Sequence, residues 1–409
     1  MSDSVPFGSL LAKIIDNRGK TCPTSEDGIP LIATNCIKNE HLYPVYEKVR
    51  YVSQEIYDTW FRGHPEPGDL IFVLKGTPGR VNWVNDPVDF CIAQDMVALR
   101  VDESKVDPKY LFAVLRSSQI QQEIEGLHVG SLIPHFKKSD FDDLQIPLVE
   151  QKLQKYIGDT YFNLSLKIDL LHRQNKTLEA MAETLFRQWF IEEAKEDWEE
   201  VPLSEVAVIQ NGYAFSSKDY VEKTVNEYEV LKMGHIDKNA TLKLNPKRDY
   251  VPRKPELKRF VLNYNDIVMP MTDMKDNVVI LGVPALVDAN DKYVLNQRVA
   301  RIYLKEDSKL SSIYYLFLQL KDPDFIARLQ STANSGVQVN LSTQAIKDCP
   351  IVIPSLEKQA EHRNTITGFY EQISNNRKQI QTLENLRDTL LPKLMSGEVR
   401  VQYQTEEVA

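Results

Sequence analysis

The chain has 409 residues, of which 42% are hydrophobic and 26% are charged, and its formal net charge is −9. This composition is typical of a soluble globular protein of two or three domains. It contains no run of about 18 apolar residues that would predict a membrane span, and the acidic balance argues against indiscriminate binding to nucleic acid. The N-terminus shows no signal-peptide pattern, and the four cysteines lack metal-ligand spacing. We therefore expect reduced thiols, a cytoplasmic location and no membrane partner.

The first 145 residues are predicted to form a mixed α/β globule. A strand–loop–strand pattern occupies residues 67–84, PGDLIFVLKGTPGRVNWV, and AQDMVALRV follows at 93–101. The loop sequence GTPGR lacks the Gly-Lys-Ser/Thr ending of a phosphate-binding loop, so we predict a turn. A second Gly-containing loop, GSLIPHFKKSDFDDLQIP at residues 130–147, completes the globule.

A long helix is predicted in the region 146–195, because apolar residues recur there at alternating spacings of four and three. This spacing is typical of the seam of a coiled coil, and a polar Asn175 within it is the kind of residue that fixes register. The predicted seam consists of Ile157, Tyr161, Leu164, Ile168, Leu171, Asn175, Leu178, Ala182, Leu185 and Trp189.

The second half of the chain repeats this plan. The phrase TLEAMAETLFRQWF at residues 177–190 returns as TLENLRDTLLPKLMSGEVRV at 382–401 with its internal spacing kept, YNDIVMPMTDMKDNVVILGV (264–283) matches the first strand–loop–strand pattern, and NQRVARIYL (296–304) matches AQDMVALRV. We therefore predict a second globule at 196–352, a second helical region at 353–409, and antiparallel pairing of the two helices. The second seam consists of Ile366, Phe369, Ile373, Asn376, Ile380, Leu383, Leu390 and Leu394, with Arg387 at one apolar position.

Two globules held apart by rigid helices would suit an object with two separated sites. Half-sites about 34 Å apart on one face of a DNA duplex are such an object. The halves differ most in their loops, as expected if they read two different half-sequences.

Several phrases carry a resemblance to a known family: TLLPKLMSGEVRV, ETLFRQWF, DWEEVPLSEVAVIQNGYAF and NRGKTCP. The chain resembles the specificity (S) subunit of bacterial type I restriction-modification enzymes along essentially its whole length. The resemblance implies two target-recognition domains that each read half of a split, asymmetric DNA sequence, with helical regions that dock two methyltransferase (M) subunits. Two restriction (R) subunits would complete the assembly. S-adenosylmethionine, ATP and magnesium are expected on those partners, and no cofactor or metal on this chain.

Candidate contacts to double-stranded DNA lie on the loops, since Arg or Lys can read guanine, Asn or Gln adenine, and carboxylates cytosine. In the first half they are Lys75, Gly76, Thr77, Arg80, Asn82, His135, Lys137 and Lys138. In the second half they are Thr272, Asp273, Lys275, Asn277, Gln338, Asn340 and Ser342. The basic residues within 243–259 are expected to contact phosphates, which position a protein without specifying sequence. Contacts within the coiled coil and to other subunits are expected from Leu164, Ile168, Leu171, Asn175, Leu178, Leu185, Trp189, Ile373, Asn376, Ile380, Leu383, Leu390 and Leu394.

Three alternatives remain open at this point. A self-contained methyltransferase or nuclease would need a catalytic tetrapeptide of the Asn/Asp-Pro-Pro-aromatic type or a glycine-rich cofactor loop, and the sequence has neither, so we expect a non-catalytic chain. A coiled-coil scaffold with two protein-binding heads would explain the helices but not the duplicated loops. The specificity subunit of a related bifunctional system that cuts beside its site would share the same architecture.

Overall fold

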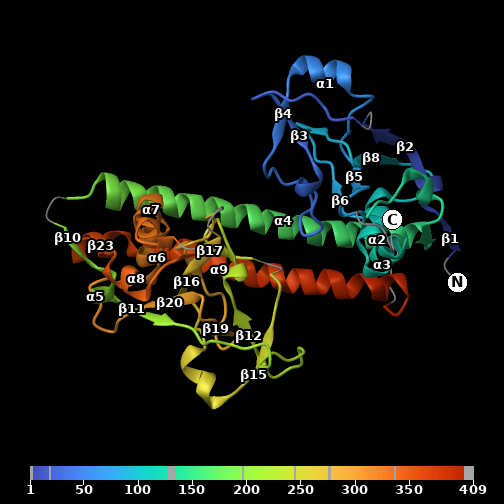
Figure 1. Cartoon of the computed structure of the whole chain (residues 1–409). Helices are drawn as coiled ribbons and strands as arrows, with labels where there is room; N and C mark the ends of the chain where they lie inside the picture. Colours follow the sequence, from blue (N-terminus) through green and yellow to red (C-terminus); the bar gives the residue numbers. More distant parts are fainter. Residues whose placement is uncertain are drawn as a thin grey trace, which may run out of the picture. The chain divides into compact units, whose positions relative to one another are not determined.

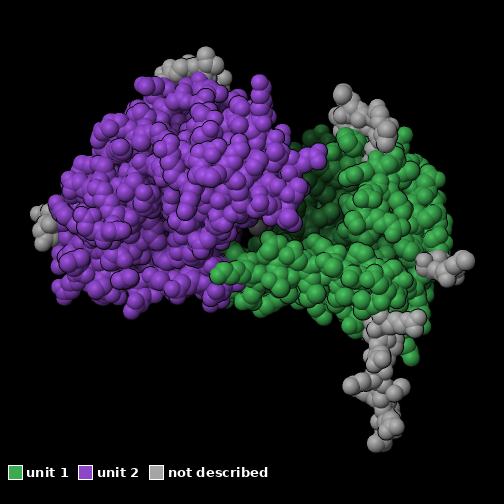
Figure 2. Space-filling view, turned by 90° about the horizontal axis from the view of Figure 1, so that it is seen from below, with its two compact units in different colours: residues 1–174, 376–409 green, residues 175–375 purple. Residues whose placement is uncertain are grey.

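The computed structural model describes residues 3–17, 20–127, 134–195, 198–243, 246–274, 278–335 and 338–399. It divides into two compact units, coloured separately in Figure 2: unit 1 is Met1–Gln174 with Asn376–Ala409, and unit 2 is Asn175–Asn375. This division cuts through both helical regions predicted at 146–195 and 353–409. Each unit therefore consists of one globule and a part of both long helices.

Unit 1 is built on an antiparallel four-stranded sheet with the order β2-β8-β5-β6 (Figure 1). One face of this sheet packs against helix α2, and the other packs against a smaller sheet of order β4-β3-β7. A two-stranded sheet, β1-β9, joins the N-terminus to the segment before the long helix. The elements are β1 (Asp3–Pro6), β2 (Leu11–Asp16), β3 (Ile29–Ile32), β4 (Arg50–Val52), α1 (Gln54–Trp60), β5 (Leu70–Val73), β6 (Val81–Trp83), β7 (Cys91–Ile92), β8 (Met96–Val101), α2 (Pro108–Arg116), α3 (Ser118–Gly126) and β9 (Gln145–Leu148).

Unit 2 repeats this topology. Its main sheet has the order β11-β20-β16-β18, the second sheet the order β15-β12-β19, and β10 pairs with β23. The second strand of the strand–loop–strand pattern predicted within 264–283 begins later than expected, at β18. The elements are β10 (Glu199–Pro202), α5 (Leu203–Val206), β11 (Ala207–Asn211), β12 (Glu227–Leu231), β13 (Ile236–Asp237), β14 (Thr241–Leu242), β15 (Tyr250–Pro252), β16 (Ile267–Pro270), β17 (Thr272–Met274), β18 (Ala285–Leu286), β19 (Tyr293–Leu295), β20 (Val299–Leu304), α6 (Ile313–Lys321), α7 (Pro323–Ser331), β21 (Asn334–Ser335), β22 (Gln338–Asn340), α8 (Thr343–Asp348) and β23 (Pro350–Ile353).

The predicted duplication is therefore confirmed in three dimensions. It extends to single hydrogen bonds: the Tyr110 hydroxyl on α2 donates to the Pro147 carbonyl (2.7 Å), and the Tyr315 hydroxyl on α6 donates to the Val352 carbonyl (3.3 Å). Each bond fastens the helix of one globule to the strand that precedes its long helix.

The two long helices, α4 (Gln151–Arg187) and α9 (Leu356–Met395), pair antiparallel in both units (Figure 1). In unit 1, Ile168 and Leu171 pack against Ile380, and the Asn376 side-chain amide donates to the Gln174 side chain at 2.9 Å. In unit 2, α4 residues such as Phe186 share a core with α9 residues such as Tyr370. The heptad prediction is confirmed. No helix in the described ranges combines the length and the apolar character needed to cross a membrane.

Arg387 occupies the apolar position that the heptad left open in α9. Its side chain is buried, and its guanidinium lies 5.6 Å from the centre of the Tyr161 ring while Nε donates to Asp388 at 2.7 Å. A cation–π contact and a charge-assisted hydrogen bond thus replace the missing aliphatic contact.

The seam residues are largely enclosed within the chain. Those that are buried are Ile168, Leu171, Asn175, Ile373, Asn376, Ile380 and Leu394, and those that are half-buried are Leu164, Leu178, Leu185, Trp189, Leu383 and Leu390. The buried members therefore serve the intramolecular helix pair, and their burial removes the basis for expecting them to contact other subunits.

At Gly158, α4 packs closely against the first turn of α2. A Cβ atom at this position would lie 2.6 Å from the backbone nitrogen of Tyr110 and 2.9 Å from the carbonyl carbon of Lys109. Although alanine is better than glycine in a helix by about 1 kcal/mol, we expect Gly158→Ala to destabilise the protein by about 1–3 kcal/mol through overpacking.

Gly368 on α9 provides the matched control, because a Cβ atom there would meet nothing within 4 Å. Gly368→Ala should stabilise the protein by about 1 kcal/mol. Urea unfolding of the two variants measures both effects, and a Gly158→Ala variant as stable as the parent would contradict the close approach.

Candidate nucleic-acid interface

The two loops predicted to contact DNA in the first half lie together at one end of the main sheet of unit 1. The segment that follows β5 runs against the segment 134–136: the Gly76 N–H donates to the Pro134 carbonyl (3.0 Å), and the Phe136 N–H donates to the Leu74 carbonyl (2.8 Å). Lys75 and His135 are paired across this bridge. We call residues 74–80 and 134–138 edge 1.

The turn within edge 1 depends on its glycines. Gly76 and Gly79 have φ angles of 86° and 87°, which favour glycine. Gly79 packs against α3, where an added Cβ would lie 3.1 Å from Ile124 Cδ1, whereas a Cβ on Gly76 would meet nothing within 4 Å. The GTPGR turn prediction is confirmed, and Gly76 leaves its backbone open to close approach.

The polar side chains of edge 1 differ in their exposure to solvent. Lys75, Thr77 and Arg80 are half-buried, and His135, Lys137 and Lys138 are exposed. The Lys138 ammonium forms an ion pair with Asp16 at the end of β2. In unit 2 the equivalent place is taken by a hydrogen bond, in which the Thr343 hydroxyl donates to the Asn211 side chain at 2.6 Å. The exposed groups of edge 1 are predominantly cationic.

Asn82 was predicted to contact a base, and the structure argues against this. The side chain is completely buried: Oδ1 accepts from the Lys38 N–H (3.0 Å), and Nδ2 donates to the carbonyls of Lys38 (2.9 Å) and His41 (2.6 Å). The half-buried Arg116, whose pKa desolvation lowers to about 10, donates to the same loop and to the β6 carbonyl of Val81. Asn82 is a structural anchor for the loop 38–42.

Asn82→Ala should therefore lower the stability of the protein without weakening its preference for a particular base at any position of the DNA site. The substitution strips the backbone groups of Lys38 and His41 of their partner, which costs about 2–4 kcal/mol. Lys137→Ala, an exposed change on edge 1, should stay within about 0.5 kcal/mol of the parent. Chemical unfolding tests the pair, and an Asn82→Ala protein of full stability with altered base preference would restore the original assignment.

Unit 2 brings its two predicted loops together in the same way. Strand β17 pairs with β22, with Thr272 opposite Asn340 and Met274 opposite Gln338. The Leu341 N–H donates to the Met271 carbonyl at 2.8 Å, as Phe136 does to Leu74 in unit 1. We call residues 271–274 and 338–342 edge 2. The predicted contacts Lys275 and Asn277 lie outside the described residues.

Three predicted contacts of edge 2 have structural roles instead. Asp273 is buried, and its carboxylate accepts from the N–H groups of Met274 (2.8 Å), Val279 (2.7 Å) and Ile280 (2.7 Å). Thr272 is 3% exposed. Ser342 is exposed but caps α8, since its hydroxyl accepts from Ala345 N–H at 3.0 Å. Burial therefore keeps Asp273 and Thr272 from presenting their side chains to a base, and the Ser342 hydroxyl is engaged as a helix cap.

Gln338 and Asn340 are more open, being exposed and half-buried respectively. The sequence prediction missed Arg298, an exposed side chain that reaches edge 2 from the start of β20: its Nη1 donates to the side-chain oxygens of Thr272 (3.5 Å) and Asn340 (3.3 Å). The aligned segments AQDMVALRV and NQRVARIYL contain this position, but their similarity gave no sign that it lies at the edge.

One end of the basic segment 243–259 lies beside strand β11 of unit 2. The Gln210 side chain on β11 donates to the Arg259 carbonyl at 2.8 Å, and β11 ends at Asn211, which accepts from Thr343 of α8. Two of its cations are paired within the unit, Arg248 with Glu229 and Arg253 with Asp291. The exposed cations without an ion pair to a described residue are Lys243, Lys247, Lys254, Lys258 and Arg259.

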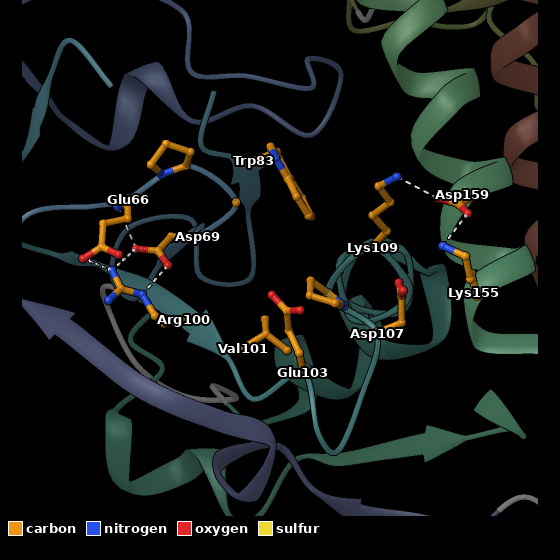
Figure 3. Close-up of a pocket in the computed structure, with 13 residues that line it drawn as sticks. Glu66, Asp69, Trp83, Arg100, Val101, Glu103, Asp107, Lys109, Lys155 and Asp159 are labelled. Carbon is orange, nitrogen blue, oxygen red and sulfur yellow. Dashed lines mark hydrogen bonds and ion pairs between the residues drawn. The ribbon is translucent and has the colours of Figure 1, made fainter. Parts of the chain in front are cut away.

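Unit 1 also contains a cavity of about 390 Å³, away from edge 1 (Figure 3). On one side Arg100 pairs with Asp69 (3.0 Å) and Glu66 (2.8 Å), and on the other Lys109 pairs with Asp159 (2.6 Å). The hydrogen bond from Lys109 holds the pKa of Asp159 below its usual value. These cations are paired with carboxylates, and the lining has five carboxylates and three cations in all, so the cavity is not a counterpart of the cationic edge 1.

The chain thus consists of two similar units. Each has polar side chains at one end of its main sheet and contains a part of both long helices, an architecture typical of a modular recognition protein. Residues 13–180 and 195–385 match the family model described as the type I restriction modification DNA specificity domain. The chain belongs to this family of specificity subunits, which are the DNA-recognition components of type I restriction-modification enzymes and not their catalysts.

Individual relatives agree with this assignment. The chain is 26% identical over 333 residues to the type I restriction enzyme MjaVIII specificity subunit of Methanocaldococcus jannaschii, covering 76% of this chain and 75% of that one. It is 21% identical over 421 residues to the EcoBI specificity subunit of Escherichia coli, covering 93% and 82%. The crystal structure of a type I S subunit from M. genitalium has the same fold, with a TM-score of 0.56, 17% identity and 96% coverage of each chain.

Proposed function

We propose that this chain reads a bipartite, asymmetric DNA site, with edge 1 contacting one half-site and edge 2 the other. The observation that carries the proposal is that both units build the same edge from the same two segments but present different polar side chains on it. The shared backbone arrangement would let both units dock on DNA in the same way, whereas the different side chains would contact different bases.

The chemistry of the two edges supports different base preferences. Edge 1 offers the cationic side chains of Lys75 and Arg80 and the imidazole of His135, whose N–H groups suit the acceptors of guanine. Edge 2 offers the amide side chains of Gln338 and Asn340, which suit adenine, together with the guanidinium of Arg298. The open cations of residues 243–259 would contact phosphates and fix the register of unit 2 on the duplex.

We also propose that the helical regions assemble with two methyltransferase subunits, and that two restriction subunits complete a restricting complex. The helix pair leaves apolar side chains exposed away from its seam: Tyr156, Leu170 and Met181 on α4 and Leu386 on α9 are each more than 40% exposed. The first three are spaced close to whole numbers of helical turns, so they share one face of α4. Exposed apolar side chains on one face are suited to a protein partner.

S-adenosylmethionine, ATP and magnesium are assigned in this proposal to the partner subunits. Isothermal titration of the purified chain with S-adenosylmethionine should show no binding at micromolar concentrations, whereas the complex with the methyltransferase subunits should bind it. Heat of binding to the isolated chain with micromolar affinity would refute this assignment.

The proposed function is tested by selection of bound DNA from a fully randomised duplex library, using the complex of this chain with its methyltransferase subunits. The expected product is a motif of two different specific blocks separated by a gap of fixed length and free sequence. A single continuous block, or no enriched sequence, would overturn the proposal.

A further inference from the structure

One position at the two edges carries a negative charge in unit 1 and a positive charge in unit 2. Asp95 stands immediately before β8 in unit 1, and Arg298 stands immediately before β20 in unit 2. The carbonyl of each accepts a hydrogen bond from the residue after the neighbouring strand: Asp95 from the Leu74 N–H (2.8 Å), and Arg298 from the Met271 N–H (2.9 Å). The two residues therefore occupy equivalent positions in the duplicated topology, and both are exposed, although Asp95 has a positive φ angle of 74° and Arg298 does not.

The Arg298 guanidinium is oriented but not neutralised. Its Nη1 donates to the uncharged oxygens of Thr272 and Asn340, at 3.5 Å and 3.3 Å. No carboxylate in the described ranges forms an ion pair with it. A guanidinium has five N–H donors in a fixed fork, so Nε and Nη2 remain for a planar ligand with two acceptors.

A contact to phosphate is the less suitable role for this position. Asp95 places a carboxylate there in unit 1, which phosphate would repel. A position that changes from acid to base between the two edges is better suited to reading bases, because arginine pairs with guanine and a carboxylate with the amino group of cytosine.

We propose that Arg298 is a specificity-determining residue that reads a guanine of the half-site of unit 2 through its O6 and N7 atoms. This inference rests on the proposed function of the two edges. Thr272 and Asn340 act as positioning residues that hold the guanidinium fork at edge 2, and the half-site of unit 1 lacks this guanine contact because Asp95 stands in its place.

The test uses the complex of this chain with its methyltransferase subunits and a library in which the two half-sites are randomised in turn. Arg298→Ala should lose roughly 10- to 100-fold of discrimination at one guanine of one half-site and leave the other half-site unchanged. Arg298→Lys should keep most of the overall affinity but lose the same discrimination, because an ammonium cannot form the bidentate fork. Lys258→Ala, an exposed change in the basic segment, should weaken binding to all sequences evenly.

An unchanged motif in Arg298→Ala, or an equal loss of binding for every sequence, would overturn the inference. The proposed function has a separate failure: it is refuted if Gln338→Ala and Asn340→Ala together change neither half-site. If the guanine preference survives in Arg298→Ala while these edge 2 variants alter the motif, the role of Arg298 is refuted and the proposed function of edge 2 is retained.

Discussion

Replacing Asp273 by alanine is expected to abolish recognition of one half-site and to leave recognition of the other intact. The carboxylate is the common acceptor for the backbone N–H groups of Met274, Val279, Ile280 and Leu281, at 2.8, 2.7, 2.7 and 3.2 Å. Each buried N–H that loses its partner costs about 1–3 kcal/mol. With partial compensation by water, we expect a loss of about 2–4 kcal/mol, confined to the loop that follows edge 2.

Hydrogen exchange of the Val279, Ile280 and Leu281 amides measures this loss locally, and sequencing of the methylated motif measures its effect on recognition. Asp307→Ala is the matched control, since Asp307 is an exposed carboxylate of the same unit, and it should change neither. Equal amide protection in the Asp273→Ala protein would contradict the role assigned to this carboxylate.

Lengthening both long helices together should widen the gap between the two half-sites without changing the bases read. The helices pair antiparallel, so a seven-residue insertion between Gln174 and Asn175 of α4 needs a matching insertion between Asn375 and Asn376 of α9. Seven residues preserve the heptad and add about 10 Å of helix, which corresponds to about three base pairs of duplex. Mapping of the methylated motif gives the gap directly.

The same insertion in α4 alone is the informative control. It would slide Ile168 and Leu171 out of register with Ile380 and separate Asn376 from Gln174, so the helix pair should lose stability. The helical account of the gap fails if the double insertion leaves the gap unchanged, or if it alters the bases of either half-site.

The architecture could be predicted from the sequence because its signals are periodic or repeated. Heptad spacing defines the seam of a helix whatever it packs against, and a duplicated phrase such as that at Thr177 and Thr382 indicates a duplicated unit. The two loops at each edge occupy matching positions in the two halves, but the sequence analysis did not predict that they pair with each other.

The roles of individual polar residues were harder to predict. Asn82 and Asp273 are residue types that read bases in DNA-binding loops, and both lie in the expected segments. Their burial results from hydrogen bonds to backbone groups that lie on another loop for Asn82 and several residues onward for Asp273, and no local pattern marks such partners. Arg298 was not predicted because it directly precedes strand β20, and the match of this segment to the first half indicates a duplicated strand and gives no sign of a DNA contact.

The measurement that tests the central claim most directly is the genome-wide methylated motif of cells that carry the complete system with one edge altered at a time. Simultaneous change of Lys75, Arg80 and His135 to alanine should alter only one half of the motif. Simultaneous change of Arg298, Gln338 and Asn340 to alanine should alter only the other half, and the gap should stay constant in both cases. If either set of changes alters both halves, or if neither set alters any part of the motif, the two units do not read separate half-sites through these edges.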